Sequence, residues 1–477
     1  MSFREYSSYD GLALAEMVRR RHVTALEVID AAIARAEAHN GKLNAIVHQA
    51  FDEARDAAKR GLTAGPFEGV PFLIKDLGTE VAGMPRSDGT RFNRNLPDTQ
   101  DSLLVKRYRA AGVNIFGKTN TPEFGITGTT ESARLGPCRN PCYTEHITGG
   151  SSGGAAAAVA AGILPLANAS DGLGSIRIPA AICGLVGMKV TQYRVPMGAG
   201  HDYGSGHGYG VQHVVSRTVR DSAAMLDATD MPEADSPFPA PPKQRPYLME
   251  VTTQPGRLRI AFSSVTPSGV VPHPEVRAAL EQTAKWLEAL GHHVEERDLG
   301  VDYRKLYKAS NAVLGANFAN AMVERVKAMG REPEQGELEP LTWRNWKGGE
   351  RVSGPDAMRG WQTLKVFTRQ IYRFFNDFDV YLTPVLITPV PKVGYIDPVR
   401  LDPREVDHRQ ASTFGYTPPF NMTNQPSLSL PLHQDSGGLP IGMMFTGRWG
   451  DEATLYRLAG QLERAHPWAH RRPPVWG

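Results

Sequence analysis

The sequence predicts an α/β fold with a largely parallel or mixed sheet. Short apolar runs of strand length recur along the chain, longer stretches with helical periodicity stand between them, and no internal repeat is found. Strands that alternate with helices in this way are typical of a sheet covered by helices. We therefore expect a central mixed β-sheet flanked by α-helices on both faces.

The first elements follow from local signals, taken in chain order. Thr24-Ala25-Leu26-Glu27 matches a capping box, so a helix is expected to begin there. Residues 69–76 are a short apolar run that ends in a lysine and an aspartate. Residues 113–125 are a second apolar run that leads into a turn. The first run is expected to form a buried strand, and the second is expected to begin with a strand.

The later part of the chain continues the alternation. An alanine-rich helix is expected after Gly154, and the apolar segment 176–190 follows it. The remaining expected elements are strands at 258–264 and 379–387, helices at 274–290 and within 302–375, and loops rich in glycine or proline at 198–210 and 232–246.

Composition and charge are those of a soluble globular protein. The chain has 477 residues, of which 41% are hydrophobic and 22% are charged. A net charge of +3 is too small to indicate binding to nucleic acid or to a membrane surface. We expect no signal peptide and no membrane-spanning segment, because no apolar run has the required length and flanks.

The cysteines give a prediction about compartment and metals. The chain has three, Cys138, Cys142 and Cys183. So sparse and odd a set argues against a disulfide framework and favours a reducing, cytoplasmic location. Cys138 and Cys142 could contribute to a metal site, but no second close pair of cysteines follows. His201, His207 and His213 are expected to be solvated loop residues, so we expect neither a metal nor a cofactor.

Two glycine-rich loops that contain serine stand on either side of the alanine-rich helix. The first is Gly149-Gly150-Ser151-Ser152-Gly153-Gly154, and the second is Ser170-Asp171-Gly172-Leu173-Gly174-Ser175. Glycine permits tight turns and close approach of the backbone. Successive N–H groups at 172–175 could form a nest for a developing oxyanion. Because one helix and its return separate the loops, the two can meet in space.

Lys75 adds a candidate base to the two loops. It ends an apolar strand, where burial would lower its pKa and make a neutral amine available. A serine could then relay the proton. The residues alone leave open that Lys75 only pairs with Asp76 and that Ser151 only caps a helix. A nucleophile elbow is disfavoured because no strand precedes Gly149, and a phosphate loop because no Gly-Lys-Ser/Thr follows.

Several segments, in order along nearly the whole chain, resemble the amidase signature family of hydrolases. They are GVPFLIKD (69–76), GKTNTPEFG (117–125), GGSSGGAAAAVAAG (149–162), SDGLGSIRIPAAICGLVGMKVT (170–191), RTVRDSAAML (217–226), DVYLTPV (379–385) and PFNMTNQPSLSLPL (419–432). The resemblance implies a single domain over 1–477, with N-terminal helices in 1–65, a catalytic signature core in 66–230 and a helical cap over the site in 300–375.

The resemblance also implies a Ser-cis-Ser-Lys triad. Ser175 would be the nucleophile, Ser151 the bridging serine after a cis peptide bond from Gly150, and Lys75 the base. Around them, the resemblance implies an oxyanion hole made by Gly172, Leu173 and Gly174, and loop-bracing roles for Ser152, Asp171 and Arg177.

The chain departs from the family pattern just before the expected nucleophile. The usual motif is Asp-Thr-Gly-Gly-Ser, whereas this chain has Asp171-Gly172-Leu173-Gly174-Ser175. Leu173 restricts the backbone where the family has a glycine, which puts the geometry of the oxyanion hole in question. Its side chain could line an acyl pocket or pack outward.

These features predict an amidase that acts on a small-molecule amide through an acyl-enzyme, without a cofactor. The chain most resembles the branch that acts on aryl amides and on linear or cyclic nylon-type oligomers, and carbamates (a urethanase activity) or esters would follow the same route. One alternative is a glutaminyl- or aspartyl-tRNA amidotransferase-type glutaminase subunit. Another is a non-catalytic binding relative, although all three triad positions are present. A homodimer is expected because dimers are common in the family.

Overall fold

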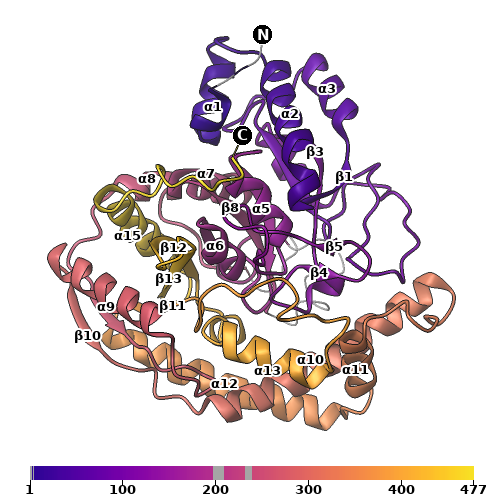
Figure 1. The fold of residues 1–477 in the computed structure, drawn as a ribbon. Helices are drawn as coiled ribbons and strands as arrows, with labels where there is room; N and C mark the ends of the chain where they lie inside the picture. The colour runs from indigo at the N-terminus through magenta and orange to yellow at the C-terminus, as the bar shows by residue number, and fades with distance from the viewer. Residues whose placement is uncertain (1–2, 4, 197–208, 231–238, 477) are drawn as a thin grey trace.

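The computed structural model of the chain describes residues 3, 5–196, 209–230 and 239–476 (Figure 1). Residues 198–208 of the glycine-rich loop predicted at 198–210, and residues 232–238 of the proline-rich loop predicted at 232–246, lie outside these residues. In the described part, helices surround a large mixed sheet, which confirms the predicted fold class.

The large sheet has eight strands. In spatial order they are β10 (His293–Glu296), β9 (Arg259–Phe262), β11 (Val380–Pro384), β13 (Pro440–Gly447), β12 (Ser427–Gln434), β7 (Val186–Lys189), β8 (Val211–Ser216) and β6 (Leu166–Asp171). The pairs β10–β9 and β9–β11 are parallel, and the other neighbours are antiparallel. The sheet is therefore mixed, with the expected strands at 258–264 and 379–387 inside it.

A separate three-stranded sheet carries the two strands that were predicted first. Its order is β1 (Ile46–Gln49), β3 (Asn114–Thr119) and β2 (Pro71–Lys75), with β2 parallel to β3. All residues of β2 and β3 are buried, as their apolar sequences predict. A short hairpin, β4 (Glu131–Ser132) with β5 (Gly136–Pro137), follows in the chain.

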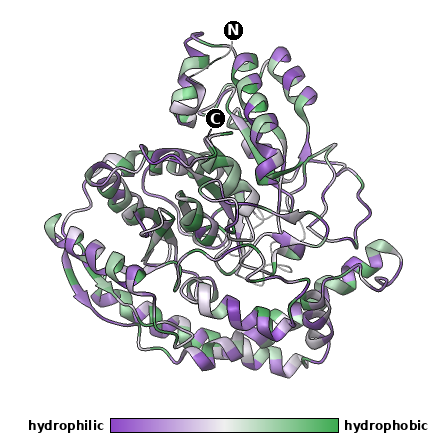
Figure 2. Cartoon of the chain, in the orientation of Figure 1, coloured by the Kyte–Doolittle hydropathy of each residue, from purple (hydrophilic) through white to green (hydrophobic). Residues whose placement is uncertain are grey.

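The helix α5 (Gly153–Ala160) is the predicted alanine-rich helix and is buried along its whole length. Figure 2 shows the centre of the molecule mostly green, whereas the peripheral helices alternate between purple and green. Small side chains allow close packing here, because a β-carbon on Gly154 would collide with the backbone of Asn120 at the end of β3. Next to α5 lies α6 (Arg177–Cys183). The first glycine-rich loop leads into α5, and the second leads into α6.

The other helices pack around this core. Thr24 caps the start of α2 (Ala25–Leu43) with the predicted capping box, since its side chain accepts from the Glu27 N–H and the Glu27 carboxylate accepts from the Thr24 N–H. The predicted helix at 274–290 is α9 (Pro274–Ala289). The further helices are η1 (Tyr6–Ser8), α1 (Gly11–Arg19), α3 (Phe51–Arg60), α4 (Leu103–Ala110), η2 (Glu123–Gly125), α7 (Val219–Thr229), α8 (Tyr247–Thr252), α13 (Pro403–Phe414), α14 (Pro419–Met422) and α15 (Glu452–Ala465).

The region 302–375 is helical, as predicted. It forms α10 (Tyr303–Met329), α11 (Pro340–Gly349) and α12 (Gly354–Asp377), which run along the lower edge of the molecule in Figure 1. A second hydrophobic cluster, separate from the main core, joins α10 and α11 to the loop that contains Phe92. The local patterns did not predict the antiparallel pair β12–β13 or the helix α15.

Candidate active site

Lys75 is a fully buried amine at the end of β2. Its backbone N–H donates to Asn168 Oδ1 of β6 (3.1 Å), which joins the small sheet to the large one. Its Nζ donates to Ser151 Oγ (2.7 Å) and to Ser170 Oγ (2.9 Å). Burial lowers the pKa of Lys75 to about 7, and the charge of Asp171 opposes only part of this effect. A substantial neutral fraction of the amine therefore exists near neutral pH.

Ser151 lies in the first glycine-rich loop, just before α5. The peptide bond between Gly150 and Ser151 is cis, as expected. A β-carbon on Gly150 would lie 2.5 Å from the Thr129 carbonyl oxygen, so only glycine fits there. Ser152 joins the two loops, because its Oγ donates to the Ser170 carbonyl (3.1 Å) and accepts from the Ser170 N–H (3.3 Å). The predicted loop-bracing role of Ser152 is consistent with these contacts.

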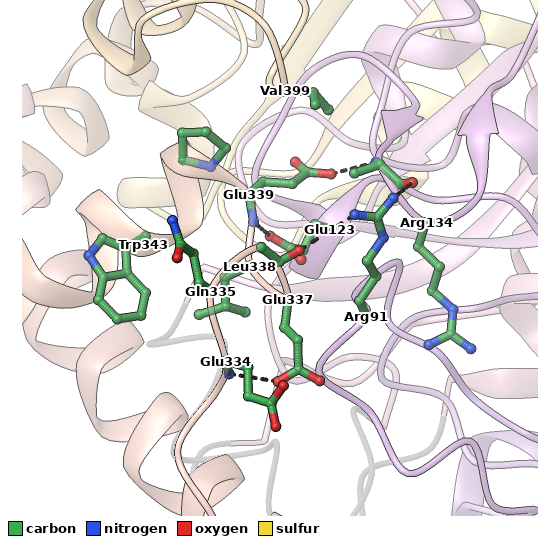
Figure 3. Close-up of a pocket in the computed structure, with 13 residues that line it drawn as sticks. Arg91, Glu123, Arg134, Glu334, Gln335, Glu337, Leu338, Glu339, Trp343 and Val399 are labelled. Carbon is green, nitrogen blue, oxygen red and sulfur yellow. Dashed lines mark hydrogen bonds between the residues drawn. The ribbon is translucent and has the colours of Figure 1, made fainter.

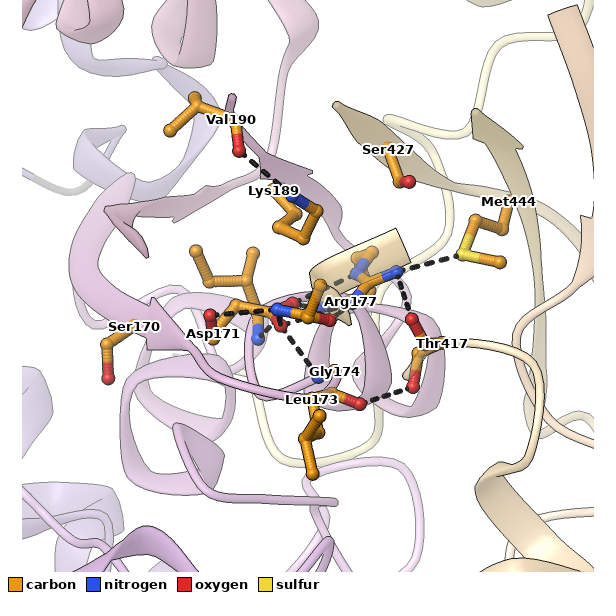
Figure 4. A network of polar contacts seen from close by, with 12 residues as sticks. Ser170, Asp171, Leu173, Gly174, Arg177, Lys189, Val190, Thr417, Ser427 and Met444 are labelled. Carbon is orange, nitrogen blue, oxygen red and sulfur yellow. Dashed lines mark hydrogen bonds and ion pairs between the residues drawn. The ribbon is translucent and has the colours of Figure 1, made fainter. Parts of the chain in front are cut away.

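The second loop is built around the carboxylate of Asp171, at the end of β6 (Figure 4). This carboxylate accepts from the N–H groups of Gly174 (2.6 Å) and Ile176 (3.2 Å). It also pairs with the guanidinium of Arg177, with Nε at 3.0 Å and Nη2 at 3.1 Å. Burial by itself raises the pKa of Asp171, but the charge and hydrogen bonds of Arg177 outweigh it and hold the pKa well below its usual range. Asp171 and Arg177 thus form a buried ion pair that shapes the loop.

Two residues from the C-terminal part complete this network, and sequence reasoning gave them no role. Asn421 Nδ2 donates to Asp171 Oδ1 (2.9 Å), and Arg177 Nη1 donates to the Thr417 carbonyl (3.0 Å). Thr417 Oγ1 also donates to the Leu173 carbonyl (2.7 Å). Ser170, the second partner of Lys75, was likewise not assigned. Asn421 lies in the segment PFNMTNQPSLSLPL, which was the one sequence signal for it.

Ser175 lies at the end of the second glycine-rich loop, directly after Gly174, and is half-buried. No hydrogen bond joins its hydroxyl to another described residue, so the structure pairs Lys75 with Ser151 but shows no direct bond from Ser151 to Ser175. Of residues 172–174, only Gly174 has a positive φ (136°). Leu173 is therefore in a conformation that any residue adopts, and its half-buried side chain packs against the hydrophobic core. Because the Gly174 N–H donates to Asp171, it is already engaged, whereas the N–H groups of Gly172, Leu173 and Ser175 have no described acceptor.

The loop geometry predicts that Gly174→Ala is destabilising and inactivating. A β-carbon there would collide with Thr417 Oγ1, and the positive φ adds strain of about 1–3 kcal/mol. Gly172→Ala is the matched control for stability, since a β-carbon at Gly172 meets open space. Urea unfolding of both variants checks this, and equal midpoints would contradict the assigned loop conformation.

A surface cavity of about 650 Å³ lies elsewhere, and none of Lys75, Ser151 and Ser175 lines it (Figure 3). Two buried carboxyl groups, Glu123 and Glu339, form part of its wall. Burial, and then the charge of Glu123, raise the pKa of Glu339 to about 8. The Glu339 N–H donates to Glu123 (2.8 Å), which ties the segment before α11 to η2.

The other candidate ligands give no metal centre within the described residues, where no three His, Cys, Asp or Glu side chains are grouped to hold an ion. His201 and His207 lie outside that part of the chain. The expectation of a solvated loop was wrong for His213, which is buried in β8 with Nε2 3.1 Å from Ser222 Oγ. Cys138, Cys142 and Cys183 are free thiols. No described helix is both long and apolar enough to cross a membrane.

Comparisons with known proteins agree with this architecture. A family model described as Amidase matches residues 27–456. A 6-aminohexanoate-cyclic-dimer hydrolase of Paenarthrobacter ureafaciens is 33% identical, over 98% of this chain and 96% of the relative. A putative amidase AmiC of Mycobacterium bovis is 38% identical, over the same shares of the two chains.

Solved structures give the same result. A 6-aminohexanoate cyclic dimer hydrolase with bound substrate superposes with a TM-score of 0.92 at 32% identity, covering 99% of this chain and 100% of that one. A bacterial aryl acylamidase superposes with a TM-score of 0.87 at 27% identity, covering 97% of each chain. The chain belongs to the amidase signature family. It is a hydrolase of carbon–nitrogen bonds other than peptide bonds.

Proposed function

We propose that the chain hydrolyses carboxylic amides through an acyl-enzyme on Ser175, with Ser151 as the relay and Lys75 as the base. The observation that carries the proposal is the 2.7 Å contact between Lys75 Nζ and Ser151 Oγ, together with a buried amine whose pKa is about 7. A base with a pKa near the working pH is effective, because a substantial fraction of it is neutral and the neutral form is still sufficiently basic. Ser175 suits the role of nucleophile because the residue is only half-buried.

The reaction begins when neutral Lys75 takes the proton of Ser151 while Ser151 takes the proton of Ser175. The Ser175 Oγ forms a bond to the amide carbon, and the carbonyl oxygen becomes an oxyanion. When the tetrahedral intermediate collapses, the carbon–nitrogen bond breaks and the amine leaves with a proton returned through Ser151. Water then attacks the ester by the same relay, which releases the carboxylic acid and restores Ser175.

For the oxyanion we propose a set of donors that differs from the one first expected, with Ser175 in place of Gly174. The Gly174 N–H donates to Asp171, which leaves the N–H groups of Gly172, Leu173 and Ser175 for the developing charge. Asp171 and Arg177 then act by holding the loop rather than by reacting. Donors fixed in this way need no reorganisation during the reaction, which is the main source of their effect.

Apolar, aryl, or linear and cyclic oligomeric amides are the substrates we propose. The named activities of the two relatives, a cyclic-dimer hydrolase and an aryl acylamidase, support this class. The half-buried apolar side chain of Leu173, two residues before Ser175, is in keeping with an apolar acyl group. Carbamates and esters share the chemistry and stay within the proposal. We also propose a cytoplasmic homodimer that binds neither nucleic acid nor membrane, and the three free thiols support the compartment.

A glutaminase subunit of a tRNA-dependent amidotransferase is the competing function. A glutamyl-tRNA(Gln) amidotransferase subunit of Thermotoga maritima shares the fold, with a TM-score of 0.79, at only 22% identity. A non-catalytic binding relative is the third possibility, and the Lys75–Ser151 pair argues against it.

The deciding experiment measures amine release from glutamine, short aliphatic amides, anilides, cyclic amides and aryl carbamates. Ser175→Ala is run beside the unchanged chain and beside Ser8→Ala, which removes an exposed hydroxyl. Release from anilides or cyclic amides that is lost only in Ser175→Ala supports the proposal. Release from glutamine alone favours the amidotransferase subunit, release that survives in Ser175→Ala removes the assigned nucleophile, and no release at all favours a binding protein.

A further inference from the structure

We propose that Arg325, on α10, is a positioning residue that holds the segment Glu123–Gly125 against Ser151. The inference rests on the proposed role of Ser151 as the relay. Arg325 lies outside the glycine-rich loops, and its role would be to keep the reacting side chains in position. Three contacts connect Arg325 to Ser151, and each is set by a different side chain or turn.

The first contact is between Gly125 and Ser151. A β-carbon on Gly125 would lie 3.0 Å from Ser151 Oγ and 2.6 Å from Leu77 Cδ2. Gly125 has a φ of 68°, a conformation that favours glycine. The backbone of Gly125 therefore forms the wall next to the relay hydroxyl, and a small displacement of this wall would free Ser151 to leave its place beside Lys75.

The second contact concerns Phe124, the residue before this wall. Phe124 has a φ of 49°, which a bulky side chain rarely adopts unless its surroundings hold it. Its N–H donates to the Asp88 carbonyl (2.8 Å). Its ring meets Phe318 of α10 edge-on at 6.0 Å, and the Arg325 guanidinium lies 5.1 Å from the ring centroid. Two residues of one helix thus fix the side chain of Phe124.

The third contact is the ion pair between Arg325 and Asp88. Asp88 is buried, and its carboxylate also accepts from the Gly78 N–H (3.1 Å), just beyond Lys75. Burial by itself raises the pKa of Asp88, but the guanidinium groups of Arg86 and Arg325 outweigh it and lower the pKa to about 2. One guanidinium therefore holds both the turn that follows Lys75 and the turn that touches Ser151.

Arg331, just beyond the end of α10, offers a matched control. It too pairs with a carboxylate, Glu337 (2.7 Å), and lies over an aromatic ring, with Phe92 at 5.3 Å. Glu337 lines the cavity of Figure 3, which contains no triad residue. Replacing either arginine removes one ion pair and one cation–π contact. The two differ in the carboxylate they pair with, because Asp88 also accepts from the turn that follows Lys75, whereas Glu337, among the described residues, accepts only from Arg331 and from the Glu334 N–H.

The test compares Arg325→Met, Arg325→Lys and Arg331→Met in two assays. The first is aniline release from an acyl anilide. The second is covalent labelling by an aryl sulfonyl fluoride, in which a serine oxygen displaces fluoride from sulfur. The rate of labelling reports the activation of the serine, and its final extent reports the fraction of folded protein.

We expect kcat to fall by about tenfold or more in Arg325→Met, with KM changed by less than about twofold, since misplacing a reacting group costs rate rather than binding. Labelling should slow by a similar factor and still reach completion. Arg325→Lys keeps the charge opposite Asp88 and should be intermediate, while Arg331→Met should match the unchanged chain in both assays.

Equal kcat values for Arg325→Met and Arg331→Met would overturn the inference. So would a loss of activity in Arg325→Met and Arg325→Lys that is matched by incomplete labelling, because that result indicates unfolding. Ser175→Ala distinguishes a failure of the proposed function from a failure of the inference about Arg325. If it still hydrolyses the anilide and accepts the label, the proposed function falls and the role of Arg325 with it, whereas failure in the arginine variants alone leaves the proposed function intact.

Discussion

Lys75→Met is expected to abolish amide hydrolysis and at the same time to stabilise the folded chain. Loss of a general base slows a reaction by about 10²–10⁴-fold. The stabilisation follows because lowering the pKa of a buried lysine from 10.5 to about 7 costs the folded state about 5 kcal/mol. Methionine has a similar length and no charge to bury, so it removes this cost while leaving Ser151 and Ser170 without their partner.

The stability that Lys75→Met gains should depend on pH in a direction that can be measured. Below pH 7 the amine is protonated in both the folded and the unfolded chain, and the full cost of burial is present. Between pH 7 and about 10.5 only the unfolded chain binds the proton, so the folded chain gains stability as the pH rises. The advantage of Lys75→Met in denaturant unfolding should therefore be largest below pH 7 and shrink toward pH 10. In the unchanged chain, kcat/KM should rise with pH through about 7 as the amine becomes neutral.

Lys189 is the matched control. It is also fully buried, and burial followed by the charge of Arg177 lowers its pKa to about 7. Its Nζ donates to the Val190 carbonyl (3.0 Å) and not to a serine (Figure 4). Lys189→Met should gain stability with the same pH dependence but keep its activity. If both variants lose activity equally, the special role of Lys75 is contradicted.

Local sequence patterns were sufficient to predict the part of the site that contains Lys75 and Ser151. Lys75 could be placed because an apolar strand ends in a lysine, and the first serine loop because glycines surround Ser151. These signals are short-range, and the structure agrees with them: the lysine is buried and the Thr24 capping box is formed. The cis peptide between Gly150 and Ser151, which the structure also has, was implied by the family resemblance.

The rest of the site depends on contacts between residues far apart in the sequence. Asn421 and Thr417 reach the second loop from the C-terminal part, and Arg325 reaches the turn at Asp88 from α10. No periodicity or turn signal records such a partner. The same limit applies to Gly174. Its N–H was expected to be available to the oxyanion, but in the structure it donates to the Asp171 carboxylate.

Asp171→Asn is expected to be the most destabilising of these substitutions. The substitution keeps the shape of the side chain but leaves the Arg177 guanidinium, which is buried, without its charge partner. Breaking a buried ion pair in this way costs about 3–5 kcal/mol, because the remaining charge is desolvated and uncompensated. The Gly174 N–H also loses a charged acceptor, so the loop before Ser175 should loosen and activity should fall with stability.

Glu281→Gln makes the same chemical change in the exposed pair between Arg277 and Glu281 (2.9 Å) and should alter the free energy of unfolding by less than about 0.5 kcal/mol. Because the pKa of Asp171 is held below its unfolded value, its contribution is present above pH 4 and lost as the pH falls further. The difference between Asp171→Asn and the unchanged chain should accordingly narrow below pH 4. Adding Arg177→Met to Asp171→Asn removes the unpaired charge and should recover stability without activity, since the loop still lacks its anchor. Recovery of activity in that double variant would show that the ion pair serves stability alone.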